Sequence, residues 1–349
     1  MSAAGALNAA VHRLAAGHSL TEDESFAAVG EVMVGGVPDA TLAAFLTALR
    51  VKGETSAELA GAVRAIRERM EPWDDRPAAS RRPWIDTCGT GGDGANTVNI
   101  STASAIVVAA AGQAVAKHGN RSASGNSGSA EVLSELGVAV DVAVDRAGRC
   151  LAELGLAFFF APSFHPALKN AAGVRRQLPF RTLFNLVGPL ASPARPEFQV
   201  VGVSGGRQQT LVAEAIVRLG TTTRAAVVRG EDGLDEVTLG GATEVVWIES
   251  GAISARRWTP EDFGLPFVAA AELRVDGPRR SAELLRSFLQ GEDGPVCWSV
   301  LANAAAALLV AGRVDSLREG VDVAGEAVDS GQALALLERW AALSQGDGA

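Results

Sequence analysis

Apolar residues recur at spacings of three and four through the first part of the chain and predict short amphipathic helices. Thr21 and Thr55 are each followed three positions later by glutamate, which fits two capping boxes. Asp39 is the expected N-cap of a helix that ends at Gly53. We expect three or four helices in a small domain, residues 1–75, which is too small to enclose a large core by itself.

A different pattern follows a polar, proline-rich linker at 72–83, because short apolar runs then alternate with helical patterns. This alternation predicts a mostly parallel sheet with helices on both faces, in a large domain over 76–349. A strand pair around 243–255 ends the sheet. The expected strands are 84–88, 114–117, 157–161, 198–204 and 225–229, and the expected helices are 101–111, 130–136, 208–219, 281–289, 296–310 and 332–343.

Residues 165–190 interrupt the alternation of strands and helices. They predict two short helices, 165–178 and 182–190, the second ended by Pro189. We expect both to leave the sheet and join the N-terminal helices. The fold class is therefore α/β, with a small all-helical domain and a large α/β domain around a mostly parallel sheet.

Composition narrows the functional classes. Hydrophobic residues make up 48% of the chain, and the net charge of −9 opposes a broad nucleic-acid footprint. A small phosphate ester needs only a few local donors, so it remains compatible. Three scattered cysteines form neither a disulfide framework nor a zinc motif, and no secretory signal or long apolar span is visible. We expect a cytoplasmic protein with reduced thiols and no membrane or nucleic-acid partner.

A glycine-rich turn, 89–94, follows the first expected strand and precedes a helix. Its spacing matches the G-x-G-x-x-G pattern of dinucleotide folds, but such a site requires an acidic residue ~20 positions further on. No Asp or Glu occurs between Gly94 and Ala130. The turn therefore favours phosphate binding by backbone N–H groups at a helix start without favouring a nicotinamide cofactor.

Neutral donors follow this turn, at Thr97, Asn99, Ser101 and Thr102. Capping by Ser101 or Thr102 explains part of this run, and phosphate binding explains the whole of it.

A second polar loop, 117–129, leaves the second expected strand. Nearly every side chain in it can form a hydrogen bond, and we expect no anchor in a core. An ordinary surface loop is one interpretation. A loop that is mobile when empty and closes over a phosphate-rich ligand is the other, and two such loops on consecutive strands favour it.

Adjacent carboxylates at Asp235 and Glu236 follow an apolar strand. Oxygen ligands of this kind suit Mg²⁺, although an acidic turn is often only solvated. Arg175, on an expected helix, is either a surface charge or a fork for a substrate carboxylate. His118 and His165 are candidates for acid–base chemistry or for structural hydrogen bonding.

Taken in order, GTGGD…TVNIST, KHGNRSxSGxSGSA, HPA…VR…RTLFNLVGPL and GxDGLDEV resemble the anthranilate phosphoribosyltransferase family over nearly the whole chain. The resemblance implies a fold like that of the pyrimidine nucleoside phosphorylases and a homodimer through the helical domain. It also implies transfer of a phosphoribosyl group from phosphoribosyl pyrophosphate (PRPP) to anthranilate in tryptophan biosynthesis, with two Mg²⁺ per subunit.

Carried over residue by residue, the resemblance implies catalytic roles for Lys117, His118 and Arg175. It implies metal ligands at Ser101, Asp235 and Glu236, and acceptor contacts at Gly89, Asn120, His165 and Arg175. The implied donor contacts are Gly89, Gly92, Asp93, Thr97, Asn99, Ile100, Ser101, Thr102, Lys117, His118, Gly119, Asn120, Arg121, Ser122, Ala123, Ser124, Gly125 and Ser129.

The chain departs from the family pattern at Asn126, Glu131, Leu178–Pro179 and 297–305. Pro179 lies near the expected acceptor side, so a paralogue with another aromatic acceptor stays open. Two further functions stay open, a pyrimidine nucleoside phosphorylase and a non-enzymatic homologue that binds nucleic acid. The phosphorylase needs no diphosphate site, and nucleic-acid binding is opposed by the net charge.

Overall fold

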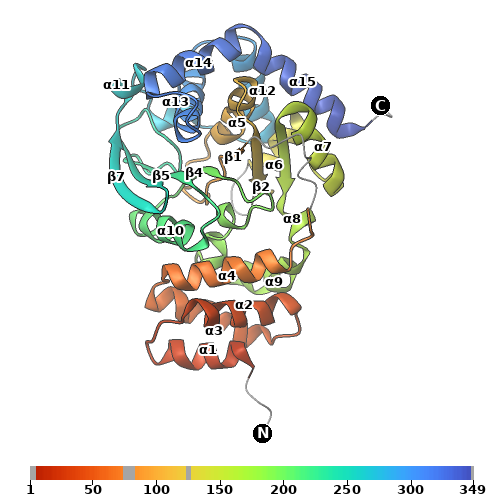
Figure 1. The fold of residues 1–349 in the computed structure, drawn as a ribbon, viewed down its shortest axis with the longest axis vertical. Coiled ribbons are helices and arrows are strands. Elements are labelled where there is room, and N and C mark those ends of the chain that lie inside the picture. The colour runs from red at the N-terminus through yellow and green to blue at the C-terminus, as the bar shows by residue number, and fades with distance from the viewer. Residues whose placement is uncertain (1–4, 74–82, 123–126, 347–349) are drawn as a thin grey trace.

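Four helices form a bundle at one end of the molecule, and the rest of the chain forms an α/β unit above it (Figure 1). The computed structural model describes residues 5–73, 83–122 and 127–346. The bundle helices are α1 (Ala6–Ala15), α2 (Glu22–Val34), α3 (Asp39–Lys52) and α4 (Ser56–Glu68).

Both predicted capping boxes are confirmed, at Thr21 before α2 and at Thr55 before α4. The predicted N-cap of α3 is wrong by one residue. Pro38 is extended, and its carbonyl already accepts the first helical bond from the N–H of Leu42 at 3.1 Å. Asp39 is therefore inside the first turn, where its negative charge complements the helix dipole.

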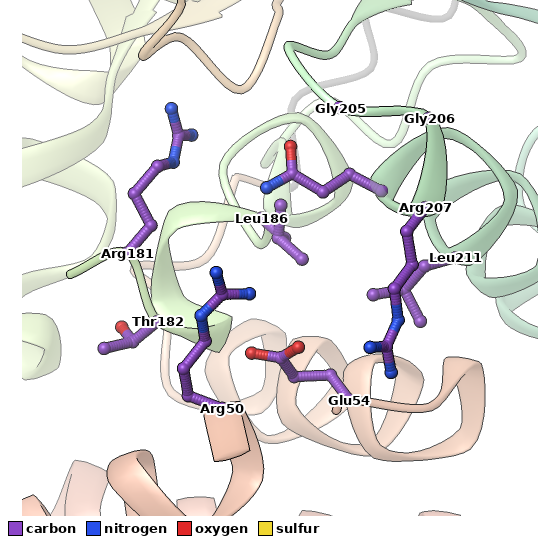
Figure 2. A pocket seen from close by; sticks show the side chains of 10 residues that line it. Arg50, Glu54, Arg181, Thr182, Leu186, Gly205, Gly206, Arg207 and Leu211 are labelled. Atoms are coloured by element: carbon purple, nitrogen blue, oxygen red, sulfur yellow. The ribbon is translucent and has the colours of Figure 1, made fainter. Parts of the chain in front are cut away.

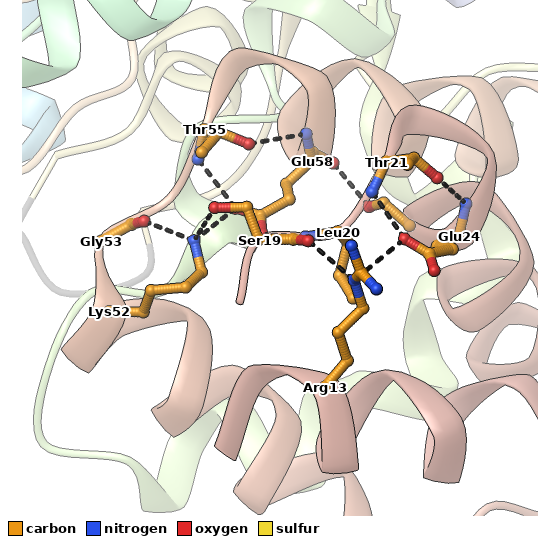
Figure 3. Close-up of polar contacts among 10 residues, drawn as sticks. Arg13, Ser19, Leu20, Thr21, Glu24, Lys52, Gly53, Thr55 and Glu58 are labelled. Atoms are coloured by element: carbon orange, nitrogen blue, oxygen red, sulfur yellow. Dashed lines mark hydrogen bonds and ion pairs between the residues drawn. The ribbon is translucent and has the colours of Figure 1, made fainter. Parts of the chain in front are cut away.

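A buried glutamate connects the turns of the bundle. Glu58 is fully buried, and its carboxylate accepts hydrogen bonds from the N–H of Leu20, the N–H of Thr55 and the ammonium of Lys52, at 2.8–3.0 Å (Figure 3). A buried carboxylate requires such partners because unpaired charge in an apolar interior is costly. The pairing fixes the start of α4 against the end of α3.

The sheet has seven strands in the order β3-β2-β1-β4-β5-β6-β7. The five strands from β3 to β5 in this order pair in parallel, and β6 and β7 are antiparallel, as the sequence predicted. The strands are β1 (Ile85–Asp86), β2 (Val115–Gly119), β3 (Leu156–Phe160), β4 (Phe198–Gly202), β5 (Arg224–Gly230), β6 (Thr243–Glu249) and β7 (Ala252–Trp258).

The predicted helices of the α/β unit are present within a few residues. The amphipathic helices α7 and α14 and the short helix α11 were not predicted from the sequence. The helices are α5 (Ile100–Ala110), α6 (Ser129–Glu135), α7 (Val144–Leu154), α10 (Gly206–Leu219), α11 (Pro260–Phe263), α12 (Pro278–Leu289), α13 (Pro295–Val310), α14 (Leu317–Asp329) and α15 (Gln332–Gln345), with a 3₁₀ turn at Ala270–Leu273.

Residues 161–191 cross from the sheet to the bundle. They form α8 (Ala161–Phe164), a 3₁₀ turn at Pro166–Leu168, α9 (Lys169–Gln177) and 3₁₀ turns at Leu183–Asn185 and Pro189–Ala191. The expected single helix over 165–178 is thus divided at Lys169. The expected helix over 182–190 is wrong, because Pro189 begins a 3₁₀ turn there instead of ending a helix.

This crossing segment is attached to the bundle by polar contacts. The Asn170 amide donates to the carbonyl of Met33 at 3.0 Å, and the Arg67 guanidinium donates to the carbonyl of Leu190 at 2.6 Å. The predicted domain boundary near residue 75 lies outside the described residues and stays a prediction.

Two apolar cores flank the sheet. One contains α5, α13 and the aromatic strand β3. The other runs from the bundle through residues 183–191 to α10 and includes Val201 and Val227 of β4 and β5. The second core joins bundle and sheet and places the carboxyl ends of the parallel strands beside residues 178–191. In the described part of the chain, no helix is long and apolar enough to cross a bilayer.

Candidate active site

The glycine turn leaves β1 and leans against the end of β4. The N–H of Thr90 donates to the carbonyl of Gly202 at 2.8 Å. A Cβ atom at Gly89 would lie 3.2 Å from an oxygen of the Asp235 carboxylate. Gly92 has φ +85°, a conformation that side chains disfavour. The turn therefore lies beside the acidic residues predicted from a distant part of the sequence.

The start of α5 corrects the capping interpretation. Asn99 is the N-cap, and its side chain does not cap the helix, because its Oδ1 accepts from the hydroxyls of Ser127 and Ser281 at 2.7 and 2.9 Å. Ser101 and Thr102 lie in the first turn, with their hydroxyls left for other partners. The Ile100 side chain is buried, so it faces the core and only its backbone could meet a ligand.

Lys117 connects these elements. Its ammonium donates to the hydroxyl of Ser101 at 3.2 Å and to the carbonyl of Thr87 at 3.3 Å. The N–H of Ser101 in turn donates to the Glu236 carboxylate at 3.3 Å. A cation, a hydroxyl and a carboxylate from three separate segments thus converge at the edge of the sheet.

The expectation that the whole of 117–129 is an unanchored loop is wrong for its first residues. Lys117, His118 and Gly119 belong to β2, and the first two side chains are buried. They alternate toward opposite faces of the sheet, as successive strand residues do. The polar loop begins only after Gly119.

The described part of this loop is held at its base. Ser129 donates to the carbonyl of Asn120 at 3.3 Å, and the Arg121 guanidinium lies over the ring of Phe160. The N–H of Ser122 bonds the Glu131 carboxylate at 3.3 Å. Ala123, Ser124 and Gly125, together with Asn126, lie outside the described residues. Thr97, on the first loop, forms a β-bridge with Arg274.

The acidic pair is electrostatically frustrated. Desolvation by the surrounding protein, together with the charge of the neighbouring Asp235, raises the pKa of Glu236 to about 8, and the positive charge of Lys117 opposes this shift. Burial and the nearby Asp93 raise the pKa of Asp235 as well. Both side chains keep partial solvent exposure. The carboxylates therefore lack the positive charge that would stabilise their ionised forms.

This donor set fits a hard divalent cation, because Mg²⁺ takes oxygen ligands and is bound by one or two carboxylates plus substrate phosphates. In the described part of the chain, no three His, Cys, Asp or Glu side chains could hold a metal by themselves. The remaining ligands must then come from hydroxyl groups, water or a bound phosphate. Asp235, Glu236 and the hydroxyl of Ser101 are the residues placed to contribute.

The predicted acceptor residues come from four segments, with Gly89 after β1, Asn120 after β2, His165 after α8 and Arg175 on α9. Arg175 lies on α9, with its guanidinium over the ring of Phe184 at 5.4 Å. Within the described residues it has no ion pair, and burial lowers its pKa. His165 packs edge-on against His118, with ring centroids 5.4 Å apart. Within the described residues, no hydrogen bond or ion pair joins Arg175 to Gly89 or Asn120.

Burial also changes the interpretation of the two histidines. It lowers the pKa of His118 to about 3 and that of His165 to about 4. His118 Nδ1 lies 2.8 Å from the carbonyl of Gly188. Both rings are therefore neutral near pH 7, and His118 is a weak base.

Arg181 had no role predicted from the sequence. Its guanidinium donates to the carbonyls of Thr90, at 2.7 Å, and of Gly91. The RTLFNLVGPL motif contains this arginine, but sequence spacing does not reveal that it reaches back to the glycine turn.

Asn303 of α13 was missed too. Its amide exchanges two hydrogen bonds with the backbone of Val237, at 2.9 and 2.8 Å. These bonds hold the acidic segment directly after Glu236. Asn303 lies in the 297–305 stretch that departs from the family pattern, which therefore has a structural role beside the site.

Two family models match the chain. Residues 8–70 match the "Glycosyl transferase family, helical bundle domain", and residues 81–334 match the "Glycosyl transferase family, a/b domain".

Curated relatives agree with these models. The anthranilate phosphoribosyltransferase of Moorella thermoacetica is 47% identical over 343 residues, which cover 96% of this chain and 100% of the relative. That of Novosphingobium aromaticivorans is 46% identical and covers 93% and 97%.

Solved structures are similar over nearly the whole chain. The anthranilate phosphoribosyltransferase of Thermus thermophilus superposes with a TM-score of 0.89 at 41% identity, covering 97% of this chain and 99% of that one. The enzyme of Saccharomyces cerevisiae in complex with PRPP and Mg has a TM-score of 0.88 at 25% identity, covering 97% and 98%. The chain thus belongs to the anthranilate phosphoribosyltransferase family.

Proposed function

We propose that this chain transfers the 5-phosphoribosyl group of PRPP to anthranilate, giving N-(5-phosphoribosyl)anthranilate and pyrophosphate in tryptophan biosynthesis. One observation carries the proposal. Lys117, Ser101 and Glu236 converge beside the glycine turn and combine a cation, a hydroxyl and a carboxylate at one sheet edge. Relatives of that name at 43–47% identity over nearly the full chain support it.

The donor would bind against two strand ends. Backbone N–H groups of the glycine turn and the first turn of α5 are suited to phosphate oxygens. The hydroxyl of Thr102 is buried without a partner and is available to a ligand at this position. Lys117 contributes positive charge from β2. Asn120, Arg121, Ser122 and Ser129 of the second loop are further described residues that we propose to contact the donor.

Mg²⁺ would be held by Asp235, Glu236 and Ser101, and when bound it neutralises charge on the pyrophosphate leaving group. We expect two ions per subunit. The raised pKa of Glu236 supports the metal role, because a cation supplies the charge that this carboxylate lacks. The yeast relative was solved with PRPP and Mg, which supports the same choice of ion.

The chemistry is displacement at the anomeric carbon. The amine nitrogen of anthranilate forms the new C–N bond as the C–O bond to pyrophosphate breaks, with inversion, and the amine proton leaves to solvent or an acceptor. An aromatic amine is a weak nucleophile, so positioning and charge stabilisation would supply most of the rate enhancement. Lys117 stabilises the leaving group in this scheme.

His118 would orient the amine. The carbonyl of Gly188 can only accept, so His118 Nδ1 carries the proton and Nε2 is left as an acceptor. That atom is buried without a protein partner. It would receive a hydrogen bond from the aromatic amine, while Arg175 holds the carboxylate and Gly89, Asn120 and His165 border the ring.

We also infer a cytoplasmic homodimer formed through the bundle. Val34 and Val51, at the ends of α2 and α3, are 65% and 82% exposed and offer apolar surface to a second copy. Size-exclusion chromatography with light scattering measures the molar mass of the protein in solution, and a monomer at micromolar concentration would contradict the dimer.

The decisive experiment follows the fluorescence of phosphoribosyl-anthranilate from PRPP and anthranilate, with and without Mg²⁺. Asp235→Asn with Glu236→Gln is expected to lose most activity at limiting Mg²⁺, whereas Glu231→Gln, an exposed acid in the same segment, is expected to keep it. Unchanged turnover in the double variant removes the metal role. A panel of aromatic amines in the same assay tests the acceptor near Pro179, and no product from anthranilate defeats the proposal.

A further inference from the structure

A second cationic pocket lies next to the proposed donor site and shares Arg181 with it, because the Arg181 guanidinium also holds the carbonyls of the glycine turn. It has a volume of about 410 Å³ and opens between the end of α3, residues 181–186 and the start of α10. Three arginines, Arg50, Arg181 and Arg207, line it from these three segments, and Glu54 is the only acid in its lining (Figure 2). The pocket therefore has two positive charges in excess.

In the described structure, the three arginines form no ion pairs with the acid in the pocket lining. Figure 2 shows the Arg50 guanidinium and the Glu54 carboxylate turned toward the middle of the pocket, with Arg207 descending from α10 beside them. Within the described residues, no ion pair of 4 Å or less joins Glu54 to any of the three arginines, and Arg50 and Arg207 donate no side-chain hydrogen bond. Their hydrogen-bonding capacity is thus available to a ligand.

The backbone favours an anion at the same position. α10 is a 14-residue helix that begins at the pocket, because its N-cap Gly205 and its first residue Gly206 belong to the lining. No side chain caps its first turn, so the free N–H groups and the positive end of the helix dipole are at the pocket. A side chain at Gly53 would collide with the Arg207 guanidinium, so the absence of a side chain there lets Arg207 approach the bundle. The Nε atom of Arg181 is buried without a partner.

We infer that this pocket binds a phosphate-type oxyanion, either inorganic pyrophosphate or a phosphate monoester, at a site separate from the donor site. Planar guanidinium groups recognise phosphate oxygens bidentately. An anion with two or more negative charges suits the two excess positive charges, whereas a single carboxylate leaves one uncompensated. The pocket is larger than one phosphate ion needs, which favours the diphosphate, an anion that the proposed reaction itself releases.

Calorimetric titration of the full chain with inorganic pyrophosphate, in the absence of Mg²⁺, tests the site, with inorganic phosphate as a parallel arm. Arg50→Gln with Arg207→Gln is expected to weaken binding at least about tenfold, the scale of one or two charge-assisted hydrogen bonds. Arg176→Gln, an exposed arginine on α9, is the matched control and is expected to bind as the unmodified protein does.

The direction in which one further variant changes pyrophosphate affinity separates a binding site from a purely structural contact between the two domains. Glu54→Gln removes the opposing charge and is expected to tighten pyrophosphate binding by roughly threefold or more. Weaker binding in that variant would mean that Glu54 holds the arginines in place, and it would overturn the inference. Equal affinities for the arginine double variant and the control would overturn it too.

Transferase activity distinguishes this inference from the proposed function. Arg50 and Arg207 form no hydrogen bond or ion pair with the described glycine turn or acidic pair, so their double variant is expected to keep forming phosphoribosyl-anthranilate at low pyrophosphate. Full activity with no change in pyrophosphate affinity would contradict the second site and leave the proposed reaction standing. Circular dichroism confirms that each variant is folded.

Discussion

A single carbonyl determines the chemical character of His118. Because Gly188 accepts from Nδ1, Nε2 of the ring is an acceptor, and burial beside His165 and Lys117 opposes protonation. The lowered pKa, about 3, means that the ring stays neutral across the range in which most enzymes work. His118 therefore acts here as a hydrogen-bond acceptor and not as a cation.

Nitrogen NMR on ¹⁵N-histidine protein measures this prediction. The signals lost in His118→Asn identify the residue, and we expect them to keep one neutral tautomer, protonated at Nδ1, from pH 5 to pH 9. Titration of those signals between pH 5 and 7 would contradict the buried, neutral ring.

Arg175 leads to a prediction about one substrate only. A guanidinium that binds a carboxylate contributes about 1.5–3 kcal/mol through charged hydrogen bonds, so its loss corresponds to roughly a ten- to hundredfold change. Arg175→Ala is expected to raise the KM for anthranilate by that factor and to leave the KM for PRPP within about twofold. Arg176→Ala, its exposed neighbour on α9, is the control. An effect confined to PRPP would place Arg175 at the donor.

At the level of single residues, the sequence indicated which side chains could take part in chemistry better than it indicated their burial and their partners. Lys117 ends the predicted strand 114–117, but Lys117 and His118 were also assigned to the start of a polar loop without an anchor, although both are buried in β2. Burial depends on what packs from elsewhere in the chain, here α5 and residues 183–191. Arg181 was missed for the same reason, since its partners are 90 residues away.

At the scale of elements, the tolerance of the glycine turn to a side chain depends on which residue lies beside each glycine. Gly92 and Gly94 both have positive φ, +85° and +74°, so alanine at either position costs about 1 kcal/mol in backbone strain. Only at Gly92 would the new Cβ collide with the Arg181 guanidinium, whereas nothing lies within 4 Å of a Cβ at Gly94.

Gly92→Ala should therefore displace Arg181 and disturb the carbonyls it holds. Its KM for PRPP is expected to rise at least about tenfold, and that of Gly94→Ala by about threefold or less, on the scale of the lost charged hydrogen bonds. Steady-state kinetics at saturating anthranilate compares the two. Equal effects would assign the loss to backbone strain alone.

The elements themselves were largely predictable, because their signals are local. Capping boxes fixed two helix starts, and apolar runs marked the strands within about two residues. Failures occurred where local signals are weak. Amphipathic α7 and α14 are more polar than their neighbours, and residues 182–190 form 3₁₀ turns whose shape depends on packing against the bundle.

At the scale of the whole molecule, the acidic site should make the free energy of unfolding of the metal-free protein depend on pH. Glu236 has a raised pKa, about 8, so the native state keeps a proton that the unfolded chain loses near pH 4.3. Stability therefore falls as pH rises through this interval and levels off above the native pKa. Below pH 6.5, the lowered pKa values of His118 and His165 act in the opposite direction, since the unfolded chain then binds more protons.

Between pH 7 and pH 8 the two histidines contribute little, and the proton linkage comes from Glu236, Asp235 and the buried Asp86, whose pKa is raised by burial to about 7. There we expect the free energy of unfolding to fall by up to about 1 kcal/mol per pH unit with EDTA present, and to stay nearly level with saturating Mg²⁺, which favours the ionised pair. Urea unfolding at pH 7.0 and 8.0 measures both slopes. Asp235→Asn with Glu236→Gln should reduce the slope in EDTA to the smaller share that Asp86 contributes, and Glu231→Gln should retain the full slope. Because buried cysteines begin to contribute only toward higher pH, an equal slope in the double variant would show that the acidic pair is not the source of the proton linkage.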